Sequence, residues 1–227
     1  MHHKKKLYFV RELSKKIEHD SMELLSNNYI KVSQYNNGIY YHPDYISPVS
    51  KIAHNLNSEI LIVLQDWASI DFLNKQEHTP EAINSGINLS LPTNKRLPIF
   101  MEEYFNKKLD QTYIINLFPY IKFGDIRASI PSKDYLYALE KFIDPFIRNL
   151  KPKLIIAIGA VTYNTFRKYK RLDQINVKES ILYPCYIDKS AIFGVPHIGG
   201  SGTAKAGGLV AVKEHWQRLA DAYNNIK

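Results

Sequence analysis

Four short runs of apolar residues dominate the hydrophobic pattern of this chain. They lie at residues 59–65, 112–118, 154–159 and 191–195. Runs of this length that are rich in β-branched residues and lack polar alternation predict strands buried on both faces of a parallel sheet. The first run continues directly into the polar residues Gln65 and Asp66, which would then lie at the carboxyl end of a strand.

The segments between and around these runs repeat apolar residues at helical spacing. We predict helices over 5–27, 98–109, 132–150, 160–170 and 209–223. Pro98 suits the first turn of the second helix, and Ser132 is a candidate N-cap of the third. The proline-containing segment 66–97 is predicted to be a long loop. The order of elements predicts the α/β class, as a three-layer αβα fold with a central four-stranded parallel sheet.

The length of 227 residues fits a single domain. We divide it into an N-terminal helix with a connecting arm, at 1–57, and a core that carries the candidate chemistry, at 58–227. The arm crosses the surface between the first helix and the first strand. Its five tyrosines suggest that it packs against the core.

Composition narrows the function classes. The formal net charge of +8 favours a polyanionic partner. The single cysteine, Cys185, excludes an intrachain disulfide framework and any four-cysteine metal or iron–sulfur site. No apolar run approaches the ~20 residues of a membrane span, and the N-terminus does not have the pattern of a signal peptide. We therefore expect a cytoplasmic protein without a membrane partner.

Polar side chains follow each predicted strand. Gln65 and Asp66, Asn116 and His197 all fall at carboxyl ends, where open α/β sheets bind their ligands. Each has a structural explanation when taken alone. Asp66 would cap the next helix, Asn116 would bond the next loop, and His197 would be an ordinary loop histidine. Their placement on one edge of the sheet predicts a functional cleft.

A glycine-rich stretch, Gly199-Gly200-Ser201-Gly202, follows His197. Before a helix, such a stretch offers backbone N–H groups and room for a phosphate. It lacks the GxxxxGK[ST] form and does not follow the first strand as GxGxxG. A nucleoside triphosphatase is therefore disfavoured.

Ordered motifs give the chain a family resemblance over residues 59–223. Leu-Gln-Asp-Trp-Ala-Ser at 64–69 resembles GQDPYH, and Gly-Ile-Asn-Leu-Ser-Leu at 86–91 resembles GLCFSV. Ile-Ile-Asn-Leu-Phe-Pro at 114–119 resembles a strand with a base-reading Asn, and 150–159 resembles the third strand. His-Ile-Gly-Gly-Ser at 197–201 stands where HPSPLS is found. In these motifs the chain resembles the uracil-DNA glycosylase superfamily.

The resemblance implies a monofunctional DNA glycosylase that flips a base out of DNA and needs no metal or redox cofactor. It implies a monomer, with DNA as the partner. No motif supplies a Schiff-base lysine, so lyase chemistry is not expected. The implied catalytic residues are Asp66 and His197. The implied base-binding residues are Gln65, Trp67, Ala68, Leu89 and Asn116. The implied DNA-binding residues are Ser69, Arg127, Gly199, Gly200, Ser201 and Lys205.

Three departures from the family pattern bear on the substrate. Ala68 stands where the family has a tyrosine that screens the C5 position of pyrimidines. Leu89 replaces an aromatic platform, and Ser201 replaces a wedge leucine. One hypothesis is a C5-substituted cytosine, hydroxymethylated or glucosylated, in phage DNA, with an antiviral role. In the other, Trp67 or another loop residue fills the gap and the enzyme is a uracil-DNA glycosylase in base excision repair. Two other hypotheses are a non-catalytic nucleic-acid binder and a hydrolase of small-molecule nucleosides or nucleotides.

Overall fold

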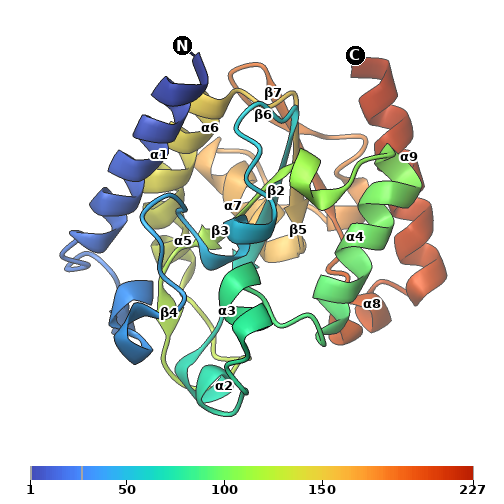
Figure 1. The fold of residues 1–227 in the computed structure, drawn as a ribbon. Helices are drawn as coiled ribbons and strands as arrows, with labels where there is room; N and C mark the ends of the chain where they lie inside the picture. The colour runs from blue at the N-terminus through green and yellow to red at the C-terminus, as the bar shows by residue number, and fades with distance from the viewer. Residues whose placement is uncertain (1, 27, 227) are drawn as a thin grey trace.

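The computed structural model describes residues 2–26 and 28–226. Its centre is a five-stranded sheet in the order β3-β2-β5-β7-β6, with helices on both faces (Figure 1). The strands are β2 (Ile60–Asp66), β3 (Tyr113–Phe118), β5 (Leu154–Ile158), β6 (Cys185–Ile187) and β7 (Ser190–Val195). β3, β2, β5 and β7 are mutually parallel. The α/β class and the parallel strands agree with the sequence prediction.

The predicted count of four strands is wrong, because β6 adds an edge strand. β6 pairs antiparallel with β7, with Tyr186 opposite Ala191. The connection is a tight turn in which Asp188 has a φ of 50°, a conformation that Asp tolerates better than most residues. β6 has three residues. A segment this short has no periodic pattern that would distinguish it from the surrounding loop.

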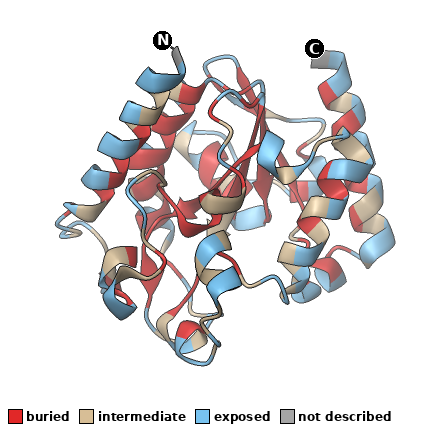
Figure 2. Cartoon of the chain, viewed as in Figure 1, coloured by how far each residue is buried: buried red, intermediate tan, exposed pale blue. Residues whose placement is uncertain are grey.

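Alternate residues of the sheet point into two separate cores. Leu61 and Val63 face the core shared with α1 (His2–Glu18), α5 (Ser132–Ala138), α6 (Asp144–Leu150) and α7 (Ala160–Tyr169). Ile60 and Ile62 face the core shared with α4 (Pro92–Phe105) and α9 (Leu209–Ile226). The central strands are therefore buried on both faces (Figure 2), which explains their unbroken apolar sequences.

Several predicted helix boundaries need correction. α1 ends at Glu18 instead of near residue 27. α4 begins at Pro92, which takes the first-turn position predicted for Pro98, while Pro98 lies inside the helix. The predicted loop 66–97 contains two short helices, α2 (Ile70–Asn74) and α3 (Pro80–Ser85). The side chains of Ser69 and Thr79 cap these helices, accepting from Phe72 N and Ala82 N.

The predicted helix at 132–150 is divided by a π-helical turn at Leu139–Ile143. Pro145 follows this turn, in the first turn of α6. Proline has no N–H to donate and its ring clashes with the carbonyl four residues earlier, so a wider turn accommodates it. After β7, a short helix, α8 (Gly200–Lys205), precedes α9.

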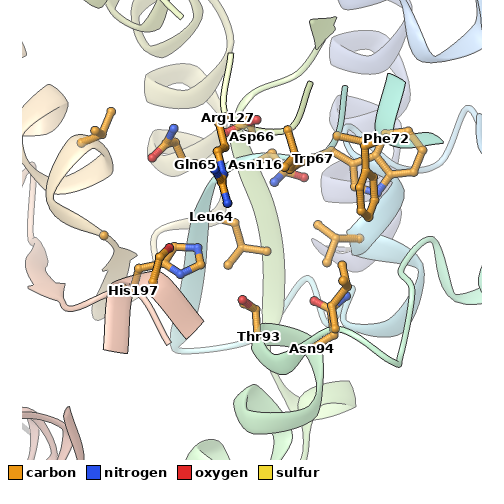
Figure 3. Close-up of a pocket in the computed structure, with 18 of the residues that line it drawn as sticks. Leu64, Gln65, Asp66, Trp67, Phe72, Thr93, Asn94, Asn116, Arg127 and His197 are labelled. Carbon is orange, nitrogen blue, oxygen red and sulfur yellow. The ribbon is translucent and has the colours of Figure 1, made fainter. Parts of the chain in front are cut away.

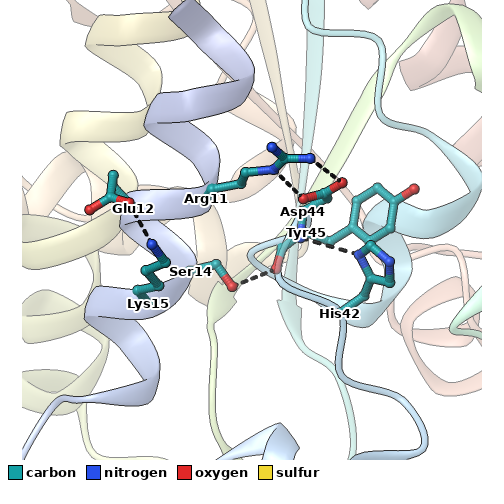
Figure 4. Close-up of polar contacts among 7 residues, drawn as sticks. All are labelled: Arg11, Glu12, Ser14, Lys15, His42, Asp44 and Tyr45. Atoms are coloured by element: carbon teal, nitrogen blue, oxygen red, sulfur yellow. Dashed lines mark hydrogen bonds and ion pairs between the residues drawn. The ribbon is translucent and has the colours of Figure 1, made fainter. Parts of the chain in front are cut away.

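The N-terminal arm is fixed to the core at several points. β1 (Tyr29–Ile30) pairs antiparallel with β4 (Ile121–Lys122). Arg11 on α1 forms an ion pair with Asp44 (2.5 Å), and Ser14 Oγ donates to the carbonyl of Tyr45 (3.1 Å) (Figure 4). These contacts hold the arm where it passes the carboxyl end of β3.

Candidate functional site

A cleft of about 910 Å³ lies at the carboxyl ends of the parallel strands. Leu64 and Asp66 of β2 line it together with Asn116 of β3, Gly159 after β5 and His197 after β7 (Figure 3). The chain runs from β2 outward to β3 and then crosses to β5 on the other side of β2. The cleft therefore lies where the strand order reverses, the general ligand site of open α/β sheets.

Asp66 is the last residue of β2, and its carboxylate forms a buried ion pair. Asp66 Oδ2 lies 2.7 Å from Lys122 Nζ, and the side chains of Asp66 and Lys122 are 11% and 5% exposed. Lys122 Nζ also donates to the carbonyl of Ile126 (2.9 Å). Because Lys122 engages Oδ2, Oδ1 is the carboxylate oxygen left for a ligand.

Lys122 lines the cleft beside Asp66 and was missed by the sequence reasoning. A lysine directly after the apolar pair Tyr120-Ile121 was a signal that it lies close to the core. That signal alone could not identify its partner, because the pairing depends on how the loop after β3 folds back beside β2.

His197 is held as a neutral imidazole with a defined tautomer. The backbone N–H of Gly199 donates to Nδ1 (2.9 Å), so the ring proton belongs on Nε2. Burial lowers the pKa of His197, and the nearby charge of Asp66 opposes this shift. Nε2–H is therefore a neutral hydrogen-bond donor at the cleft.

The glycine-rich stretch packs closely around His197. A Cβ atom at Gly202 would lie 2.4 Å from the His197 carbonyl oxygen, and one at Gly199 would lie 2.8 Å from Cε1. The two glycines are therefore needed for packing. The N–H of Gly199, which we expected to meet a phosphate, is donated to the histidine instead.

Asn116 has one amide atom bonded and the other without a partner. Its side chain is buried, with 2% of the residue exposed. Ser47 Oγ, from the arm, donates a hydrogen bond to Asn116 Oδ1. Asn116 Nδ2 has no hydrogen-bond partner among the described residues. An unsatisfied buried donor costs about 1–3 kcal/mol, so this group is a candidate ligand contact.

Gln65, Trp67 and Ala68 also line the cleft. Gln65 Nε2 donates to the Tyr135 hydroxyl (2.8 Å), and burial raises the pKa of Tyr135, helped by the charge of Asp66. Trp67 Nε1 donates to the Gly86 carbonyl (2.8 Å). This bond holds the indole at the opposite end of the cleft from His197 (Figure 3).

Some of the residues expected to bind DNA line the cleft, and others do not. Arg127, Ser201 and Lys205 line the cleft. Ser69 is fully buried as the cap of α2, which leaves it no surface for DNA. Leu89 is 53% exposed and, like Gly199 and Gly200, is not among the lining residues. The structure therefore does not bring Leu89 to the base-sized part of the cleft as a platform.

Across residues 2–26 and 28–226, no group of three or more His, Cys, Asp or Glu side chains could hold a metal ion. Within the same residues, no helix is both long and apolar enough to cross a membrane. No protein-family model matches the chain, and no curated protein matches it.

Proposed function

We propose that this protein is a monofunctional DNA glycosylase, which hydrolyses the N-glycosidic bond of a pyrimidine extruded from DNA and leaves an abasic site. The observation that carries the proposal is the joint placement of three groups in one cleft. They are the carboxylate of Asp66, the neutral Nε2–H of His197 and the amide nitrogen of Asn116, which has no partner among the described residues.

The chemistry needs two charges to be stabilised. When the bond between C1′ and N1 breaks, its electron pair leaves with the base, and positive charge develops on the sugar. Asp66 Oδ1 would stabilise that cation and accept a proton from the water that attacks C1′, a role that carboxylates have in glycoside hydrolysis. Nε2–H of His197 would donate to the O2 atom of the departing base, where negative charge gathers.

The other groups suit a DNA substrate. Asn116 would contact the Watson–Crick edge of the extruded base. Arg127 and Lys205 line the cleft and would contact backbone phosphates, which agrees with the net charge of +8. The volume of about 910 Å³ is near the upper end of the ~300–1,000 Å³ of ligand sites, so it has room for more than an unmodified base.

For the substrate we propose a C5-substituted cytosine, hydroxymethylated or glucosylated, of the kind found in phage DNA, with an antiviral role. The small side chain of Ala68 in the cleft lining supports this choice. The bond between Trp67 and Gly86 supports it further, because it holds the indole away from His197. Uracil in base excision repair is the alternative substrate.

The test is mass spectrometry of the base released from oligonucleotides that differ only in one nucleotide. The panel holds uracil, a thymine mismatch, hydroxymethylcytosine and its glucosylated form. We expect release of a modified cytosine by the wild-type protein and loss of release in Asp66→Asn, with DNA binding retained. Equal turnover by the wild type and Asp66→Asn would refute the proposal.

A second candidate is a non-catalytic nucleic-acid binder with the same cleft. The ion pair between Asp66 and Lys122 favours this candidate. The ammonium of Lys122 offsets the negative charge of Asp66, which would otherwise stabilise the sugar cation. Tight binding to the panel with no base released from any member would establish this candidate in place of the glycosylase.

A further inference from the structure

We infer that Ser47, a residue of the N-terminal arm, sets the base preference of the cleft by fixing the orientation of the Asn116 amide, so that the site favours a cytosine-type edge over a uracil-type edge. This inference rests on the proposed function, since it concerns how the same cleft reads an extruded base. Ser47 has no part in the family motifs and does not line the cleft itself.

The orientation of the Asn116 amide follows from its one bonded atom. The Ser47 hydroxyl donates to Oδ1, and the pair is buried, with Ser47 4% and Asn116 2% exposed. A hydroxyl can donate one hydrogen bond only. Oδ1 is therefore turned toward Ser47, and the other atom of the amide, the Nδ2 donor, is buried with no partner among the residues that the structure describes.

Two residues that line the cleft therefore carry neutral donors, His197 with Nε2–H and Asn116 with its buried Nδ2–H. A cytosine has adjacent acceptors at O2 and N3, and its donor is the amino group on C4. A uracil has an N3–H donor between its acceptors at O2 and O4. The donor pair matches O2 and N3 of cytosine, whereas uracil would bring its N3–H into the cleft without an acceptor from Asn116.

An acceptor for the cytosine amino group is available nearby. Gln65 lines the cleft and donates its Nε2 to the Tyr135 hydroxyl (2.8 Å). The amide oxygen of Gln65 is then the atom left to accept a hydrogen bond. Both amides are thus oriented by hydroxyl partners, with a donor from Asn116 and an acceptor from Gln65.

Contacts on both sides of Ser47 hold the backbone of this segment in place. Asp44 and Tyr45, just before it, are bonded to α1 (Figure 4). Pro48, just after it, lies against Gly86, where a Cβ atom would be 1.8 Å from the Pro48 carbonyl oxygen. The backbone of Ser47 is therefore held on both sides, with its hydroxyl bonded to Asn116.

The test compares two substrates with the same C5 substituent, 5-hydroxymethylcytosine and 5-hydroxymethyluracil, each with and without a glucosyl group. They differ only in the edge that Asn116 would read. A buried donor left unsatisfied costs enough to slow the wrong substrate about tenfold or more. We expect wild-type single-turnover release from the cytosine form to exceed release from the matched uracil form by at least that factor.

Ser47→Ala removes the hydroxyl and frees the amide to turn, so the ratio of the two rates should fall toward one. The matched control is Ser50→Ala, which removes a buried hydroxyl from the same turn. The Ser50 hydroxyl donates to Ile114 O (2.6 Å) instead of to Asn116. This control should keep the wild-type ratio. Melting temperatures of all three proteins check that they are folded.

A wild-type preference for the uracil form would overturn the inference, and so would a ratio that Ser47→Ala leaves unchanged. Either result would leave the glycosylase proposal standing, because base release would still be seen. Release from no member of the panel would instead refute the proposed function.

Discussion

Replacing Lys122 with Met removes a buried cation from the cleft and keeps most of the volume of its aliphatic side chain. Removing one partner of a buried ion pair typically costs about 3–5 kcal/mol, because the other charge is left in a region of low dielectric constant. Asp66 keeps 11% exposure at the cleft, so we expect the lower value, about 3 kcal/mol. For a chain of this length that corresponds to a fall in melting temperature of roughly 6–12 °C.

The assay is a double-mutant cycle of urea unfolding on Lys122→Met, Asp66→Asn and the double variant. The double variant leaves neither charge without its partner, so its loss of stability should be smaller than the sum of the single losses. We expect a coupling free energy of about 1–3 kcal/mol. Lys168→Met is the control, since Lys168 donates to Ser132 Oγ (3.2 Å) at an exposed site.

A coupling free energy below about 0.5 kcal/mol, the value expected of independent sites, would contradict a buried ion pair. A Lys122→Met protein no less stable than Lys168→Met would contradict it equally. In either case the ion pair of Asp66 and Lys122 would not be buried in solution.

Three further predictions concern pH, packing and salt. The pKa of His197 lies below its ordinary value of 6.5, so the imidazole is neutral at pH 7. Protonation of Nδ1 would remove the acceptor of the Gly199 N–H and disturb the position of the ring, so base release should fall only as the pH drops below 6.5. In His197→Gln, which keeps an N–H donor without titrating, pH–rate profiles should lose that decline. Gly86→Ala places a Cβ atom 1.8 Å from Pro48 O at a φ of +70°, so thermal unfolding should show a loss of more than about 1 kcal/mol, and an unchanged melting temperature would contradict the contact. DNA affinity measured by fluorescence anisotropy should fall steeply with salt, and Lys205→Ala should reduce the log–log slope by about 0.7–0.9; a slope equal to that of the wild type would exclude a phosphate contact.

The sheet could be predicted from sequence because each of its long strands is marked by the apolar residues of that strand alone. The strands β2, β3, β5 and β7 are largely buried on both faces, and each is therefore mainly apolar, without polar alternation. β6 has three residues and alternates buried with exposed positions, which loop sequences often do by chance. Pro92 and Pro98 are both compatible with a first turn, and only the packing of Leu97, Phe100 and Met101 in the second core extends α4 across Pro98.

The positions of Asp66, Asn116 and His197 could also be predicted, because the carboxyl ends of parallel strands share one edge of the sheet. The groups that orient these side chains could not be predicted. Ser47 meets Asn116 across 69 residues of sequence, and Lys122 meets Asp66 through the loop after β3. Gly199 was expected to meet a phosphate, and its donation to His197 depends on a tight turn that the glycine-rich sequence permits without requiring.

The most direct test of the central claim is a crystal structure of the Asp66→Asn protein bound to duplex DNA with one modified cytosine. We predict that the base is extruded into the cleft, with its O2 atom within hydrogen-bond distance of His197 Nε2 and its Watson–Crick edge against Asn116 Nδ2. A base that stays stacked in the duplex, or DNA bound to another face of the protein with the cleft unoccupied, would contradict it.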